Sequence, residues 1–122
     1  MRPHIDKTTF GTITIGGTAF AHDVIVRPDG RVKRRKKRLS KAVYGTSHVL
    51  SLQEAKYVRK QAASAERLII GSGQHGNVSL SPEAAAYLKR RHCRVVIAPT
   101  PKVIDIWNKE KGEAIGLFHV TC

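Results

Sequence analysis

The sequence is poor in cysteine and has no long apolar run. Its two cysteines, Cys93 and Cys122, have no CxxC partner, which excludes a zinc ribbon and favours free thiols over a disulfide framework. No stretch approaches the roughly 18 consecutive apolar residues that a membrane span needs. Residues 1–7 contain no apolar segment of the kind found in a signal peptide. We therefore expect a cytoplasmic protein with no membrane partner.

Acidic residues are absent between Gly30 and Glu54, and basic residues are concentrated there. Residues 31–41 hold eight of the 22 basic residues; the other 14, set against 9 acidic residues, reduce the net charge from +13 to +5. Such a block attracts nucleic acid, nucleotides or an acidic partner, or protects an exposed strand edge. It contains no aromatic residue, so the stacking platforms of single-strand binders are not evident, and two interpretations stay open: a solvated charged face, or a purely electrostatic contact with phosphates. The predicted basic patch consists of Arg31, Lys33, Arg34, Arg35, Lys36, Lys37, Arg38 and Lys41.

The length of 122 residues suits one hydrophobic core, so we expect residues 1–122 to form a single domain. The first third is rich in strand signals, with β-branched residues in alternation and a Gly16-Gly17 turn that predicts a hairpin. Residues 36–47 have no clear period, and residues 44–48 are assigned to a loop. The predicted strands of this region are residues 10–15, 18–20, 23–27 and 31–34.

Capping signals predict three helices in the remainder of the chain. Ser51 and Glu54 match a capping box, in which each side chain binds the backbone amide of the other, at the start of a helix over residues 52–63. Ser81, followed by proline and an acid, begins a helix that ends near Arg91. Thr100 repeats the combination of cap and proline before a third helix.

Apolar strands alternate with these helices, at residues 68–70, 94–98 and 115–122. Strand–helix–strand units favour right-handed crossovers and parallel pairing, whereas the early hairpin is antiparallel. The sequence therefore predicts an α/β fold with a mixed sheet, an N-terminal antiparallel hairpin and helices packed on the sheet.

A glycine-rich loop, residues 71–76, follows the first of these apolar strands and formally matches GxGxxG. In a dinucleotide fold the third glycine opens a helix directly, whereas here the next helix begins at Ser81, and an acid about 20 residues further on is missing. No cofactor is therefore expected. Two interpretations remain open: a tight loop required by the structure, or a loop whose amides bind another anion or a carbonyl group.

Ser81 and Thr100 head helices that are entered from the carboxyl ends of neighbouring strands, which is where α/β sheets bind ligands. His48 and His75 lie in polar loops and His119 lies on the final strand. His119 and Cys122 are three residues apart, so a strand points them to opposite faces and no metal site is expected. Adjacent Ser47 and His48 do not suit a nucleophile and its base, and structural hydrogen bonding is the alternative for each histidine.

Several short blocks make the chain resemble the small Mth-type domain family. They are Phe10-Gly11, residues 26–30, Tyr44-Gly45-Thr46-Ser47-His48, residues 69–73 with Gly76, and the ending Phe118-His119-Val120-Thr121-Cys122. The resemblance implies a three-layer α/β fold. Its relatives include an adipogenesis-associated domain protein and a mitochondrial factor that helps assemble respiratory complex I, which suggest protein-interaction roles and no catalytic residues. The basic run departs from the animal members.

The sequence therefore leaves three possible functions open. The first is a non-enzymatic protein-interaction or assembly domain with a protein partner. The second is a small-anion site or enzyme at the rim of the sheet, and the third is nucleic-acid binding through residues 31–41. The candidate ligand-binding residues are Tyr44, Gly45, Thr46, Ser47, His48, Gly71, Ser72, Gly73, His75, Gly76, Ser81, Thr100 and His119.

Overall fold

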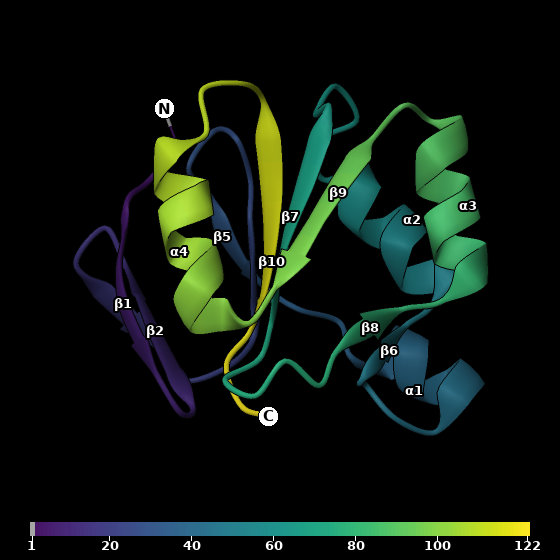
Figure 1. Cartoon of the computed structure of the whole chain (residues 1–122), viewed down its shortest axis with the longest axis horizontal. Helices are drawn as coiled ribbons and strands as arrows, with labels where there is room; N and C mark the ends of the chain where they lie inside the picture. The colour runs from purple at the N-terminus through teal and green to yellow at the C-terminus, as the bar shows by residue number, and fades with distance from the viewer. Residues whose placement is uncertain (1) are drawn as a thin grey trace.

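The computed structural model describes residues 2–122 and is built around a five-stranded mixed sheet (Figure 1). The strand order is β5-β4-β10-β7-β9. β10 pairs in parallel with β7 and antiparallel with β4, and β7 pairs in parallel with β9. The α/β prediction with a mixed sheet is confirmed. The strand bounds are β4 Val24–Val26, β5 Val32–Arg34, β7 Arg67–Ser72, β9 Arg94–Ala98 and β10 Ala114–His119.

Elements on both faces of this sheet make three layers. Helices α2 (Leu52–Lys60) and α3 (Pro82–Arg90) cover one face. The other face is covered by helix α4 (Thr100–Lys109) and by an antiparallel sheet of β1 (Ile5–Thr9), β2 (Thr12–Ile15) and β3 (Thr18–Phe20).

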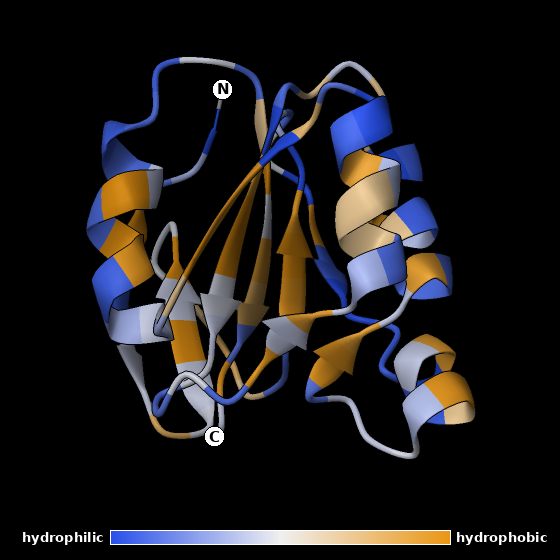
Figure 2. Ribbon diagram, turned by 45° about the vertical axis from the view of Figure 1, so that its right-hand side comes forward, coloured by the Kyte–Doolittle hydropathy of each residue, from blue (hydrophilic) through white to orange (hydrophobic). Residues whose placement is uncertain are grey.

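Alternation along the central strand supplies both cores. Leu68 and Ile70 of β7 pack in the core beneath α2 and α3, whereas Ile69 packs on the other side with Trp107 of α4. Figure 2 shows these apolar strands enclosed between helices whose outer faces are hydrophilic. The apolar run at residues 68–70 is therefore a central strand covered on both faces, as the sequence predicts.

Four elements of the structure were not predicted from the sequence. Strand β1 was not predicted because Ile5 is its one apolar residue, and its other residues are polar and exposed or partly exposed. Helix α1 (Arg38–Tyr44) was missed because it is short and its N-cap, Lys37, makes no side-chain capping bond. A short parallel pair, β6 (Val49–Leu50) with β8 (Ser79–Leu80), completes the fold. Among residues 2–122, no helix combines the length and apolar character needed to cross a bilayer.

Two of the predicted helix caps are confirmed, and one is wrong. Ser51 and Ser81 each accept from the amide three residues on, at 3.1 Å. Glu54 does not reach back to the Ser51 amide, which donates instead to Ser40 Oγ at 2.9 Å. Thr100 is not a cap either, because Pro99 holds that position and makes no side-chain bond. The Thr100 hydroxyl is engaged elsewhere.

Candidate functional site

The glycine-rich loop lies at the carboxyl end of β7, and its backbone amides are bound within the chain. Each of the amides of residues 73–79 donates a hydrogen bond to an internal acceptor. Those acceptors are Thr100 Oγ1 and the backbone oxygens of His48, Ser72, Gly73, Thr121 and Cys122. Of the two interpretations left open for this loop, a tight loop required by the structure fits these bonds, because the amides are already paired with acceptors of the chain itself. An anion would have to displace them.

Close packing explains the glycines at the start of the loop. A Cβ added at Gly71 would lie 2.7 Å from the Thr100 hydroxyl oxygen. Gly73 has a φ of +104°, and its added Cβ would collide with the backbone of Cys122. The Thr100 hydroxyl donates to the His119 carbonyl at 2.7 Å and accepts from the Gly73 amide at 2.9 Å. Gly71, Gly73 and Thr100 thus join the loop, α4 and β10 together.

A cavity of about 460 Å³ does lie at this rim, between the loop and the end of β9. Of the candidate ligand-binding residues, it is lined by Ser72, His75 and Gly76. The other lining residues are Val78, Ser79, Leu80, Ile97, Ala98 and Pro99. The lining is therefore mostly apolar and contains no lysine or arginine, which suits an apolar group better than an anion. Ligand binding at these three residues stays a prediction.

Two of the three singled-out histidines come together. The rings of His48 and His119 meet edge to face, with centroids 5.4 Å apart. His75 lies 6.2 Å from the ring of Phe10, at the turn between β1 and β2. Of these three histidines, His75 alone lines the 460 Å³ cavity at the rim.

His119 belongs to a buried polar network around Asp23, which precedes β4. Its Nδ1 lies 2.7 Å from Asp23 Oδ2, and the Val120 amide donates to Asp23 Oδ1 at 2.9 Å. Burial by itself would raise the pKa of Asp23. The hydrogen bonds from His119 and Val120, with the charges of His119 and Lys37, outweigh burial and lower this pKa from 3.8 to about 2.

The order Asp23, His119, Thr121 resembles a nucleophile-activating triad, because the Thr121 hydroxyl lies 3.2 Å from His119 Nε2. Two observations favour a structural role. His119 is only 2% exposed. The loop amides beside it, which would have to stabilise an oxyanion, are already bound to carbonyl oxygens. The triad-like arrangement therefore holds the C-terminal segment against β4 and the loop.

Arg35 extends this network and does not belong to a surface patch. It is 5% exposed, and its guanidinium binds Asp23 at 3.0 Å, Glu54 at 2.6 Å and the Ser47 carbonyl at 2.8 Å. The prediction that Arg35 is part of an exposed basic patch is therefore wrong. Most of the run is exposed as predicted, at Arg31, Lys33, Arg34, Lys36, Arg38 and Lys41, with Lys37 partly buried 3.6 Å from Asp23.

The remaining candidates have identifiable structural contacts. Tyr44 donates to Glu83 at 3.1 Å, and Gly45 ends α1 in a left-handed conformation. Thr46 Oγ1 accepts from the His48 amide at 3.1 Å. Within residues 2–122, no three His, Cys, Asp or Glu side chains are grouped so that they could hold a metal ion.

Stability should depend on pH through Asp23. Folding lowers the pKa of the Asp23 carboxyl, so this group stabilises the folded state at pH values above its unfolded-state pKa. The contribution is lost as the pH falls from about 4 to about 2. The shift corresponds to about 2 kcal/mol. Between about pH 5 and pH 2, we expect the unfolding free energy, measured in urea, to fall by about 2 kcal/mol more in the wild type than in Asp23→Asn. Equal pH dependence of the two proteins would contradict this assignment.

The comparisons with known proteins agree with this architecture. The family model described as "Protein of unknown function (DUF498/DUF598)" matches residues 5–116. The crystal structure of conserved hypothetical protein PH1505 from Pyrococcus horikoshii OT3 is 32% identical, with a TM-score of 0.88, over 97% of this chain and 98% of that chain. MT938 is 29% identical, with a TM-score of 0.83, over 98% and 99% of the two chains. No curated protein matches the chain.

A more distant structure shows the fold alone. A Mth938-like domain from Bordetella pertussis is 17% identical, with a TM-score of 0.65, over 97% of this chain and 85% of that chain. The family match spans nearly all of the chain and includes the hairpin, the glycine loop and the mixed sheet up to Gly116 of β10. The chain therefore belongs to the DUF498/DUF598 family of Mth-type domains.

Proposed function

We propose that this protein is an interaction domain that binds an extended segment of an acidic partner protein along the edge of β9. The observation that carries the proposal is the state of this strand. β9 pairs with β7 on one side only, and its Ile97 side chain is 42% exposed. An apolar strand with an open edge is a template for strand addition.

The backbone groups of the open edge follow from the pairing register. The Arg94 amide donates to the Glu66 carbonyl, so the Arg94 backbone is directed toward β7. In a parallel ladder, successive residues direct their amide and carbonyl groups to alternate sides. The backbone groups of Val95 and Ile97 are therefore directed away from β7, where an added strand would pair with them.

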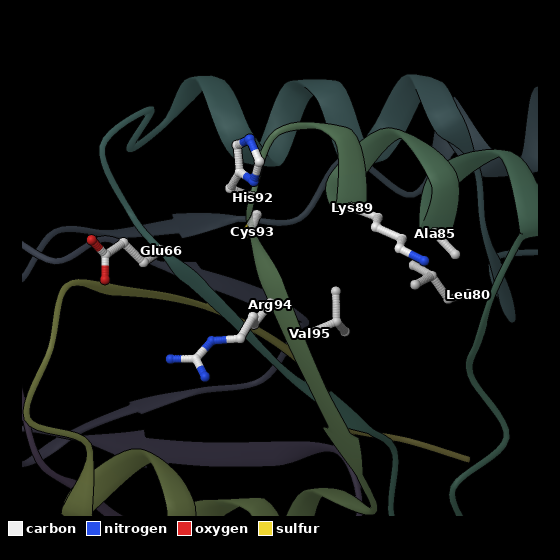
Figure 3. A pocket seen from close by; sticks show the side chains of 8 residues that line it. All are labelled: Glu66, Leu80, Ala85, Lys89, His92, Cys93, Arg94 and Val95. Carbon is white, nitrogen blue, oxygen red and sulfur yellow. The ribbon is translucent and has the colours of Figure 1, made fainter.

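Cavities lie along both ends of this edge. One, of about 760 Å³, is lined by Val95 of β9 together with Ala85 and Lys89 of α3 (Figure 3). The other is the 460 Å³ cavity next to Ile97, and Leu80 lines both. Pockets for alternate side chains beside a strand edge are what give specificity in strand addition.

Charge selects the occupant. The 760 Å³ cavity is lined by Lys89, His92 and Arg94, with Glu66 as its one acidic residue. This end of the β9 edge therefore favours an acidic segment. A second copy of this chain is disfavoured because each copy carries a net charge of +13. We place the interaction in the cytoplasm, where free thiols such as Cys93 and Cys122 stay reduced.

A peptide library displayed on phage supplies the probe. We expect the full chain to select peptides in which apolar and acidic residues alternate. Ile97→Lys should weaken their affinity, measured by fluorescence polarisation, by at least about tenfold, because it puts a cation in the apolar part of the groove. Val43→Lys is the matched control, since Val43 is 50% exposed on α1.

Hydrogen exchange locates the binding. Bound peptide should slow exchange at the amides of Val95 and Ile97, which a site elsewhere would not do. Peptides that bind Ile97→Lys as tightly as the wild type would overturn the proposal. Self-association through β9, seen by sedimentation as a dimer that Ile97→Lys abolishes, would also overturn it by making a second copy the occupant.

A further inference from the structure

Cations from two separate parts of the sequence lie on the outer side of α2 and α3, arranged on two tyrosine rings. The ammonium groups of Lys33 and Lys36 lie 5.8 and 4.4 Å from the ring centroid of Tyr57. The Lys56 ammonium and the Arg91 guanidinium lie 5.8 and 5.4 Å from the ring centroid of Tyr87. Lys56 and Tyr57 are consecutive residues of α2, so this one helix contributes to both clusters.

The register of β5 explains how part of the basic run reaches this side. Lys33 is paired with Ile25, whose side chain lies in the core beneath α2 and α3. Arg34 is paired with Val24, whose side chain lies in the core on the α4 side. Directly paired residues share a face of the sheet, so the basic run is divided between both faces.

A groove of about 380 Å³ runs between α2 and α3 within this region. It is lined by Leu52, Lys56, Tyr87, Arg90 and Arg91, so it presents three cations and no acid. Arg59, which donates to the Arg91 carbonyl, adds a fourth cation, and its buried Nε has no hydrogen-bond partner among residues 2–122. The α2 acid, Glu54, is buried and paired with Arg35.

We propose that this surface, the α2–α3 basic face, binds the sugar–phosphate backbone of nucleic acid independently of base sequence. It comprises Lys33, Lys36, Lys56, Arg59, Arg90 and Arg91. The two tyrosine rings hold cations on their faces, so they position charges for phosphates instead of stacking bases. The cations extend beyond the groove as far as Lys33, which suits an extended polyanion better than a single phosphate group.

The distribution of exposed apolar side chains argues against an anionic membrane as the ligand. The large apolar side chains that are exposed are Phe10, Val43, Tyr44 and Ile97, and none of them lies on α2 or α3. Helices that bind a membrane surface insert apolar side chains below their cationic ones. The α2–α3 basic face also excludes Lys89, Arg94 and the β9 edge, so its failure and the failure of the proposed peptide site are separate results.

The test measures binding of a fluorescein-labelled DNA duplex of mixed sequence, about 20 base pairs long, to the full chain at several salt concentrations. Lys56→Glu with Arg91→Glu should weaken binding at low salt by at least about tenfold. It should also reduce the slope of log K against log salt by about 2, because two phosphate contacts are lost. The control, Lys102→Glu with Lys109→Glu, makes the same charge change on α4, across the sheet (Figure 1).

Three outcomes would overturn the proposal. One is that the α4 control weakens binding as much as the α2–α3 variant, which would mean diffuse attraction to net charge. Another is an unchanged salt slope in a Lys56→Glu/Arg91→Glu protein whose circular dichroism shows the native fold. The third is binding to vesicles of phosphatidylserine and phosphatidylcholine without binding to the duplex, which would make a lipid surface the ligand.

Discussion

Replacing Arg35 with methionine is expected to lower the free energy of unfolding by about 3–5 kcal/mol. The guanidinium is the cationic partner of Glu54, which is completely buried, and it also binds Asp23. Methionine fills much of the same volume but leaves the Glu54 carboxylate without a cation in a site from which water is excluded. Urea unfolding at neutral pH, followed by circular dichroism, measures the loss.

Two further variants distinguish the effect of leaving Glu54 unpaired from the effect of removing an arginine in general. Arg38→Met removes an exposed arginine from the same run and should change the unfolding free energy by no more than about 0.5 kcal/mol. Arg35→Met combined with Glu54→Gln should recover part of the loss, because the unpaired carboxylate is gone. A loss below about 1 kcal/mol in Arg35→Met would contradict the role assigned to this network.

The network matters because it joins segments that the sequence separates widely. Asp23 precedes β4, Glu54 lies in α2, and His119 ends β10. Arg35 also donates to the carbonyl of Ser47 at 2.8 Å, which ties down the loop before β6. One network of charged side chains therefore connects that loop, the first turn of α2 and the end of β10. These contacts hold together the rim of the sheet at which the glycine-rich loop lies.

Local signals were sufficient for most of the fold. The serines at positions 51 and 81 are caps in the structure, and the apolar run at residues 68–70 is a buried central strand. Such features depend on neighbouring residues, so a sequence pattern records them. Helix α1 is the exception among the helices because Ser40, its buried residue, is held by long-range bonds to Ser51 and Glu54.

The features that could not be predicted depend on contacts between residues far apart in the sequence. Arg35 is one of eight basic residues in an eleven-residue span, residues 31–41, and nothing in the pattern distinguishes it from its exposed neighbours. Glu54 was assigned to a capping box because its spacing from Ser51 fits one, but its carboxylate binds the guanidinium of Arg35 instead. The β9 run reads like the central β7 run, and only the strand order reveals that Ile97 lies at an open edge.

The candidate ligand site was predicted from local sequence alone, and ligand binding there stays a prediction. A glycine-rich loop after a strand has many free amides when it is considered alone, so an anion is a natural ligand for it. In the folded chain, the carbonyls of Thr121 and Cys122 accept from Gln74, His75 and Asn77. These acceptors lie more than 40 residues away in the sequence, so no local motif records the pairing.

Gly73→Ala should therefore be strongly destabilising, by roughly 2–4 kcal/mol. The added Cβ would lie 2.7 Å from the Cys122 carbonyl oxygen and 2.7 Å from the ring of His119, at a φ of +104°. Relief requires the C-terminal segment to move, which would break the hydrogen bonds from the loop amides. Urea unfolding measures the cost, and faster hydrogen exchange at the amides of His75 and Asn77 reports the movement.

Gly45→Ala separates backbone strain from the collision. Gly45 has a φ of +71°, but an added Cβ there would meet no atom within 4 Å, so only the strain of roughly 1–2 kcal/mol is expected. The difference between the two variants measures how tightly the C-terminal segment is held in the loop. Equal losses, with unchanged exchange at His75, would mean that the collision at Gly73 is relieved without breaking the hydrogen bonds of the loop amides, and would contradict the close packing assigned to this glycine. Faster exchange at His75 in Gly73→Ala alone would instead show that the C-terminal segment is what keeps these amides from an external anion.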